Sequence, residues 1–319
     1  MENKINVKLL SMAGQGGSMF GITLMELMKE RDDIMVLSAD MSTPAGLDKF
    51  KAAYPEHFMN VGIAEQNMIG IAAGLADEGY KVICVAQACF ITMRCFEQVR
   101  QYAGYMGIPM ILVGIGSGLS LQYMGNTHYA LEDIALMRTI PGMTVMAPCD
   151  SLEAMKSLEC AVNSDTPTYI RVFGGTGIPA VHQADFEFER DKASTLREGK
   201  DVAILATGSM VLQSLKAAEA LAVEGFDCSV IDVHTIKPFD KSILEDVAGK
   251  KLIVTVEEHR KHGGLGSVVA EELSGNITDI KTLRIGVNEE FPLPGSYAYM
   301  LDTKGLSVDA ICKKIKESL

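Results

Sequence analysis

The first candidate for chemistry in this 319-residue sequence is a single acidic residue, Glu65. It ends the segment Asn60-Val-Gly-Ile-Ala-Glu65, and the apolar residues that follow, from Met68 to Leu75, recur at helical spacing. A carboxylate in the first turn of a helix often does no more than interact favourably with the helix dipole. A buried carboxylate can instead hold or transfer a proton during a reaction. The residue and its position alone leave both roles open.

Aromatic, sulfur-containing and cationic side chains further along the chain could bind a substrate or a cofactor. Phe90, Met93 and Phe96 recur at i, i+3 and i+6, so they could form an apolar slot for a flat ring or an ordinary part of a core. Arg171 lies in a predicted strand, where its guanidinium could bind an anionic substrate or form a surface ion pair. Arg94, one turn beyond Phe90, is a further candidate cation.

The elements that must position these residues are short apolar segments, rich in β-branched residues, that alternate with longer segments of helical spacing. The predicted strands of the first half cover residues 34–40, 81–86, 109–115, 143–148 and 167–172. Because these segments are continuously apolar rather than alternating, they predict a parallel sheet covered by helices on both faces. Ligands of such sheets bind beyond the carboxyl ends of the strands. We therefore expect the site in the segments that follow the strands.

The pattern lapses after Arg171, in a stretch that is first glycine-rich and then charged. We expect a linker without a core element over residues 176–199, after a first domain over residues 1–175. A second series of strands and helices follows over residues 200–319 and ends in a helix near 308–319. The predicted fold class is therefore α/β, with two parallel-sheet domains.

Acidic residues and histidines gather where one strand of the second domain is expected to end. They are Glu257, Glu258, His259 and His262. A metal site would require these side chains to converge on one point. Their place in a charged segment before several glycines favours a solvated loop instead, and we expect no metal ligands in this chain.

The bulk composition narrows the classes of function. A net charge of -12 and a pI near 5.0 argue against nucleic acid and anionic membranes as partners. Seven cysteines without a CxxC pair fit a reduced protein. No apolar stretch is long enough for a membrane span, and the first residues have too little apolar length for a signal peptide. These features predict a cytoplasmic protein.

Several segments, taken in order, closely resemble the transketolases and deoxyxylulose-phosphate synthases. The pyrimidine-binding domain of that family is matched by NVGIAEQNMIGIAAGLA (60–76), CFITMRCFEQVR (89–100), THYALEDIALMRTIPGMTVMAP (127–148) and PTYIR (167–171). The C-terminal domain is matched over residues 200–319, with DVHTIKPFD (232–240) and VEEHRKHGGLGS (256–267). The resemblance implies a thiamine-diphosphate-binding fold of the pyrimidine type, followed by a transketolase C-terminal-like domain.

The resemblance also implies a partner subunit. In this family a GDG…N motif holds the diphosphate of thiamine diphosphate together with Mg²⁺ or Ca²⁺, and the motif is absent from this sequence. The sequence therefore resembles the C-terminal subunit of a split transketolase, whose N-terminal-type partner subunit would carry the motif and bind the metal. The implied assembly is a heterotetramer or a self-dimer of this chain.

Roles for single residues follow from the same resemblance. Glu65 matches the catalytic glutamate that hydrogen-bonds the pyrimidine N1′ of the cofactor and so favours its imino tautomer. Further cofactor contacts are implied for Asp40, Ile63, Phe90, Met93 and Phe96. Substrate contacts are implied for His128, Arg171 and Arg94, with Arg171 matching the arginine that receives the anionic tail of a sugar phosphate.

Three positions depart from the family pattern. Met124 replaces an acidic residue, Gly116 replaces a histidine, and Tyr129 replaces a glutamine. The first two changes make the substrate funnel less polar, so the donor or the acceptor is expected to differ from the usual pentose phosphates.

The function implied is that of a transketolase-like transferase, which moves a two-carbon ketol unit from a ketose to an aldose. The ketose is expected to be a sugar phosphate or a similar anionic sugar. The alternatives are a ketoacid-decarboxylating synthase, a 2-oxoacid dehydrogenase β-type subunit, and a non-catalytic scaffold subunit.

Overall fold

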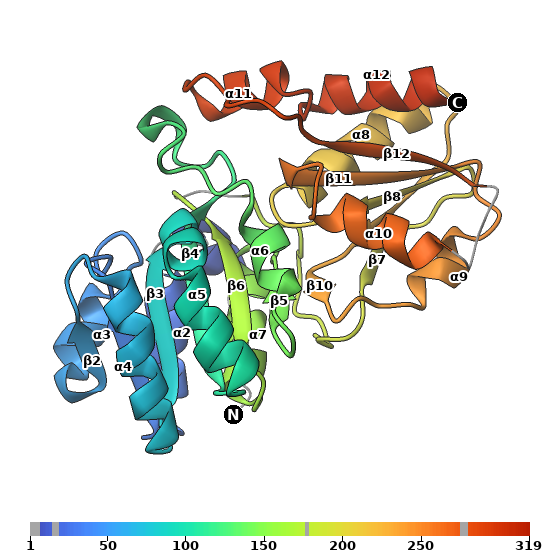
Figure 1. The fold of residues 1–319 in the computed structure, drawn as a ribbon. Coiled ribbons are helices and arrows are strands. Elements are labelled where there is room, and N and C mark those ends of the chain that lie inside the picture. Colours follow the sequence, from blue (N-terminus) through green and yellow to red (C-terminus); the bar gives the residue numbers. More distant parts are fainter. Residues whose placement is uncertain (1–6, 15–18, 176–178, 275–279) are drawn as a thin grey trace.

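The computed structural model describes residues 7–14, 19–175, 179–274 and 280–319, and it places them in two α/β domains, each built on one sheet (Figure 1). The first domain lies at the N-terminal end of the colour range and the second at the C-terminal end. Across the described residues, no helix is both long and apolar enough to cross a bilayer.

The sheet of the first domain has seven strands in the order β10-β5-β6-β4-β3-β1-β2. Its strands are β1 (Ile34–Ser38), β2 (Phe58–Asn60), β3 (Lys81–Gln87), β4 (Met110–Ser117), β5 (Thr144–Met146), β6 (Thr168–Phe173) and β10 (Thr235–Lys237). All pairs are parallel except β10 with β5. The five strands predicted for this domain are confirmed. β2, with only three residues and an exposed end, was not expected.

Helices cover both faces of this sheet (Figure 1). They are α1 (Val7–Ala13), α2 (Met19–Leu27), α3 (Asp48–Ala53), α4 (Glu65–Asp77), α5 (Phe96–Val99), α6 (Asp133–Thr139) and α7 (Ser151–Val162). Alternate residues of β3 serve the two faces: Val82 and Cys84 pack in one core with α4 and α5, whereas Ile83 packs in another with α2 and α7. Because both faces of the sheet are buried, the sequences of its strands are continuously apolar.

The second sheet has five strands in the order β12-β11-β8-β9-β7. They are β7 (Ser194–Arg197), β8 (Val202–Ala206), β9 (Cys228–Asp232), β11 (Leu252–Arg260) and β12 (Lys281–Val287). The helices of this domain are α8 (Met210–Val223), α9 (Ile243–Val247), α10 (Leu265–Leu273), α11 (Tyr297–Thr303) and α12 (Val308–Ser318). Helices α8 and α12 share one core with the sheet, while the opposite face of the sheet continues into the core of the first domain.

Two strands differ from the two-domain expectation. β7 lies inside the predicted linker, yet it pairs antiparallel with β9 at the edge of the second sheet. β10 belongs to the second domain by sequence, yet it pairs antiparallel with β5 and extends the first sheet. Both are edge strands of only four and three residues, which are too short to give a clear apolar pattern in the sequence. The domains therefore interlock through backbone hydrogen bonds, and their sheets are mixed with a parallel majority.

Candidate active site

The turn before Glu65 is fixed by the ends of two neighbouring strands. Asn60 ends β2, and its Oδ1 accepts hydrogen bonds from the backbone N–H groups of Asp40 (3.1 Å) and Gly62 (3.0 Å). Its amide nitrogen donates to Asp40 Oδ1 at 3.2 Å. Gly62 has a φ of +74°, a conformation that favours glycine. Asp40 and Asn60 thus set the direction in which the chain enters α4.

Glu65 is the first residue of α4 and is only 3% exposed. Its Oε2 accepts a hydrogen bond from Arg94 Nη1 at 2.7 Å. The Arg94 guanidinium lies 4.1 Å from the centre of the Phe90 ring, and that ring meets the His128 ring edge to face at 5.4 Å. The structure thus brings together four of the residues singled out in the sequence, which we call the Glu65 cluster: Glu65, Arg94, Phe90 and His128.

The segment that carries Phe90 is not an α-helix. Phe90–Arg94 forms one turn of π-helix, whose wider turn places Arg94 over Phe90. Met93 is 42% exposed, whereas Phe96 is half-buried against the core beneath α4. The expected common face of Phe90, Met93 and Phe96 is therefore not formed, because an i, i+3, i+6 face requires the narrower α-helical turn. π-helical turns of this kind often mark functional sites.

Arg171 has a different environment from the substrate-binding position expected for it. Its side chain is 3% exposed, and its Nε donates to Asp133 Oδ2 at 2.8 Å. Its Nη2 donates to the backbone oxygens of Ala130 (3.0 Å) and Glu258 (2.8 Å). Tyr169 donates to the same Asp133 oxygen at 2.7 Å. The geometry gives no support to a substrate contact, because this guanidinium is buried and joins the first domain to β11 of the second.

Glu258, which was expected in a solvated loop, is buried and holds a neighbouring loop. It is 1% exposed at the end of β11, and its Oε1 accepts a hydrogen bond from the backbone N–H of Leu119 at 2.5 Å. Its Oε2 accepts hydrogen bonds from Ser209 and from Tyr297. Burial raises the pKa of the Glu258 carboxyl above its usual range. A carboxylate of the second domain thus anchors the loop over residues 116–125, in which the sequence departs from the family pattern.

The altered loop residues have distinct positions. Met124 is half-exposed, while Gly116 has a φ of +81° and leaves no room for a Cβ beside Leu121. Tyr129 is buried, and its hydroxyl donates to the backbone oxygen of Gln122 and contacts Met300 Sδ at 3.2 Å. The glycine and the tyrosine therefore shape the loop, and only Met124 remains open to solvent.

Gly118→Ala is expected to weaken the contact between the Glu258 carboxylate and the loop over residues 116–125. A Cβ at Gly118 would lie 2.4 Å from Glu258 Oε1, in a residue whose φ is +61°. Gly142 is a matched control because its φ is +73° and a Cβ there would meet nothing within 4 Å. Both alanine variants carry backbone strain of about 1–2 kcal/mol, and overpacking adds about 1–3 kcal/mol for Gly118→Ala alone. Urea unfolding measures the loss of stability in both variants. Equal losses would contradict the role of Glu258 in holding this loop.

The acidic and histidine residues at the end of β11 do not all converge on one point, although Glu257 Oε2 lies 3.8 Å from His259 Nδ1. Glu257 is 1% exposed, and its two oxygens accept hydrogen bonds from the backbone N–H groups of Leu265 (2.7 Å) and Gly266 (2.9 Å) at the start of α10. His259 is fully buried and His262 is exposed. The expectation of a solvated loop is wrong for the first three residues, because β11 continues to Arg260 and buries them.

The fold and the Glu65 cluster define a class of protein: the pyrimidine-binding half that is typical of enzymes depending on thiamine diphosphate. The chain belongs to the transketolase family. Residues 16–173 match the transketolase pyrimidine-binding domain, and residues 191–311 match the transketolase C-terminal domain. The family and the domain order predicted from the sequence are confirmed.

Individual relatives are similar over nearly the whole chain. One of the subunits of the apulose-4-phosphate transketolase of Phocaeicola vulgatus is 36% identical over 93% of this chain and 95% of its own length. A 6-deoxy-6-sulfo-D-fructose transketolase subunit of a Clostridium species is 37% identical over 92% of this chain and 91% of its own length. The solved structure of a split gene transketolase, an inactive beta4 tetramer, has a TM-score of 0.86 and 35% identity, and covers 96% of this chain and 99% of the other.

Proposed function

We propose that this chain is the pyrimidine-binding subunit of a two-subunit transketolase that moves a two-carbon ketol unit from a ketose to an aldose. The observation that carries the proposal is the hydrogen bonding of the Glu65 carboxylate. One oxygen of this buried carboxylate is held by Arg94, and no donor among the described residues hydrogen-bonds the other oxygen, Oε1. A carboxylate oxygen without a donor, in a side chain that is only 3% exposed, is suited to share a proton with a weakly basic ring nitrogen.

The residues around Glu65 fit the pyrimidine ring of thiamine diphosphate. Phe90 offers a half-buried ring, and Met93 and Ile63 offer apolar side chains that are 42% and 76% exposed. Flat rings bind well between aromatic and apolar surfaces. When bound, thiamine diphosphate supplies a nucleophilic carbon that can take up and release a ketol unit. Glu65 and Phe90 would hold its pyrimidine ring, with Asp40 at the edge of the site.

Arg94 and His128 are placed to serve the substrate side. The ion pair with Arg94 fixes the rotamer of Glu65, and stacking on Phe90 fixes Arg94 in turn. His128 contacts the Phe90 ring edge to face and is half-buried, so its ring can contact a sugar hydroxyl. Its Nδ1 is within 2.8 Å of Thr127 Oγ1, which orients the ring. The anionic tail of a substrate would then require a cation other than Arg171.

The proposed partner is an N-terminal-type subunit that binds the diphosphate group with Mg²⁺ or Ca²⁺. Ile63 and Met93 leave apolar surface exposed next to Glu65, as expected of a surface covered by another subunit. The relatives named as transketolase subunits, and a similar structure described as an inactive tetramer of one chain type, support this dependence. A heterotetramer, or a dimer of this chain within it, is the proposed assembly.

Mixing is the direct test of the proposal. This chain alone is expected to transfer no ketol unit, and the mixture with the diphosphate-binding subunit is expected to transfer it from ketose to aldose phosphates when thiamine diphosphate and Mg²⁺ are supplied. The products can be separated by chromatography, and pyruvate in place of the ketose is the control. Release of carbon dioxide from pyruvate without ketol transfer would replace the proposal by the ketoacid-decarboxylating alternative. No turnover of either substrate would favour a scaffold subunit.

A further inference from the structure

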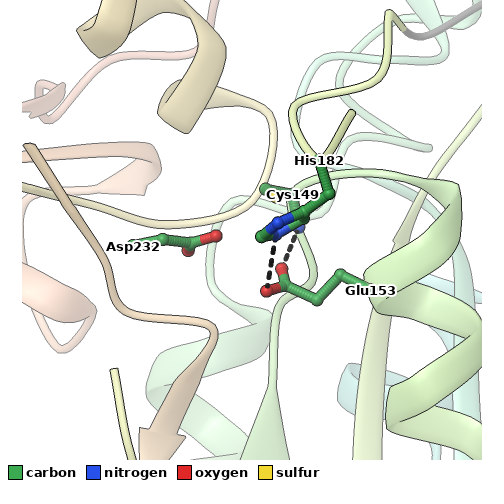
Figure 2. Close-up of side chains that lie close together, drawn as sticks. All are labelled: Cys149, Glu153, His182 and Asp232. Atoms are coloured by element: carbon green, nitrogen blue, oxygen red, sulfur yellow. Dashed lines mark hydrogen bonds and ion pairs between the residues drawn. The ribbon is translucent and has the colours of Figure 1, made fainter. Parts of the chain in front are cut away.

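A second group of reactive side chains lies away from the Glu65 cluster, where the two domains and the segment between them meet. It consists of Cys149, Glu153, His182 and Asp232, whose potential ligand atoms all lie within 4.8 Å of one another (Figure 2). Cys149 and Glu153 flank the start of α7, His182 lies between the domains in sequence, and Asp232 ends β9. The group therefore joins three parts of the chain.

The four side chains are buried and largely unsatisfied. Glu153 and Asp232 are fully buried, Cys149 is 2% exposed and His182 is 8% exposed. Neither oxygen of Asp232 has a hydrogen-bond partner among the described residues, and the same holds for Glu153 Oε1 and His182 Nε2. His182 Nε2 and Glu153 Oε1 lie 3.5 Å apart, at the distance of an ion pair but without a hydrogen bond. Buried polar atoms without hydrogen bonds are costly, so a ligand bound between these side chains would stabilise the group.

Neighbouring groups hold these side chains in position. Asp150 Oδ1 accepts from the backbone N–H of Glu153 at 2.9 Å, and its Oδ2 accepts from the backbone N–H groups of Val181 (2.9 Å) and His182 (2.8 Å). The Phe186 ring stacks on the His182 ring at 3.8 Å. A second layer of contacts that orients ligands is what a built metal site requires.

We propose that Cys149, Glu153, His182 and Asp232 bind one zinc-class divalent cation that links the two domains. A thiolate, an imidazole and two carboxylates form a donor set suited to Zn²⁺, whereas Mg²⁺ and Ca²⁺ prefer oxygen ligands alone. Zinc–ligand bonds of about 2.0–2.3 Å place tetrahedral ligand atoms roughly 3.3–3.8 Å apart. The group would thus contract by about 1 Å around the ion. Four protein ligands leave no open position, so the ion is structural.

A route for an ion to the group is available, because Cys149 lines a cavity of about 450 Å³ that is bordered by Phe173 of the first domain and by Ser209 and Tyr297 of the second. An ion could therefore approach Cys149 from this cavity.

The test measures the zinc content of the full-length chain. The chain is first freed of metal with a chelator, then incubated with excess ZnCl₂, and finally desalted to remove unbound zinc. One zinc per chain is expected by mass spectrometry of the metal, and Cys149→Ser and Asp232→Asn should each lower the affinity more than about 100-fold. Cys160→Ser, in α7 but outside the group, and Asp246→Asn, at an exposed position, are the matched controls and should keep the zinc.

Substitution with Co²⁺ reports the ligands independently of ketol transfer. The wild-type chain should show the visible bands of tetrahedral Co²⁺ and a thiolate-to-cobalt charge-transfer band, and Cys149→Ser should lose the latter while folding as judged by circular dichroism. Zinc should also raise the melting temperature of the wild-type chain but not of Asp232→Asn. A wild-type chain that holds no more zinc than the Cys149→Ser/Asp232→Asn double variant would overturn the proposal and leave a metal-free buried network.

Discussion

Glu65→Gln is expected to lower ketol transfer by the mixed subunits by roughly 10²–10⁴-fold, the range attributed to a positioned proton-transfer group. The amide keeps the size of the side chain and can still accept a hydrogen bond from Arg94 Nη1, but it cannot take up or share a proton. Transfer of the ketol unit from ketose to aldose, followed at saturating thiamine diphosphate, measures the loss. The unfolding midpoint of the variant should change little, because the shape of the site is retained.

Glu97→Gln is the matched control for this substitution. Glu97 lies on the neighbouring helix α5 and is exposed, so the same chemical change there should leave the transfer rate within about twofold of wild type. A Glu65→Gln enzyme with near wild-type rate would remove the carboxylate from the chemistry and the cofactor assignment with it. Loss of assembly with the partner subunit, measured by gel filtration, would instead give Glu65 a role in the interface.

Arg171→Met is expected to destabilise the chain by about 3–5 kcal/mol, as for other broken buried ion pairs. The change leaves Asp133 fully buried with the Tyr169 hydroxyl as its one side-chain partner among the described residues, and it removes the nitrogen that donates to the carbonyls of Ala130 and Glu258. Unfolding in urea, followed by circular dichroism, measures the cost. Since the carbonyl of Glu258 belongs to β11, the contact between the domains should weaken together with the fold.

Arg138→Met provides the comparison for Arg171→Met. Arg138 pairs with Glu271, whose side chain is 59% exposed, so its loss should cost less than about 1 kcal/mol. A double variant, Arg171→Met with Asp133→Leu, should be less destabilised than the sum of the single changes, because no unpaired charge remains. If Arg171→Met kept full stability but raised the KM for a phosphorylated sugar, the arginine would be a substrate ligand and the structural role would be wrong.

The sequence by itself determined the family, five of the seven strands of the first sheet and the position of Glu65. Strands buried on both faces must be continuously apolar, so their bounds can be read without a structure. Glu65 follows from the same local logic, because a helix start is marked by the residues next to it in the chain. The motifs around Phe90 and His128 also lie in single segments, and the structure brings both residues to the Glu65 cluster.

Only the tertiary structure decided which polar residues are buried and with which partners. The sequence suggests that Arg171 is a substrate ligand, but in the structure Asp133 and the Glu258 carbonyl surround it. The sequence likewise suggests that the Glu258 carboxylate is solvated, but the loop at Leu119 covers it. Cys149 and Asp232 are 83 positions apart in the numbering, and no local pattern relates them. Residues of this kind meet through the packing of one domain on the other, whereas sequence periodicity reports only which side of its own element a residue occupies.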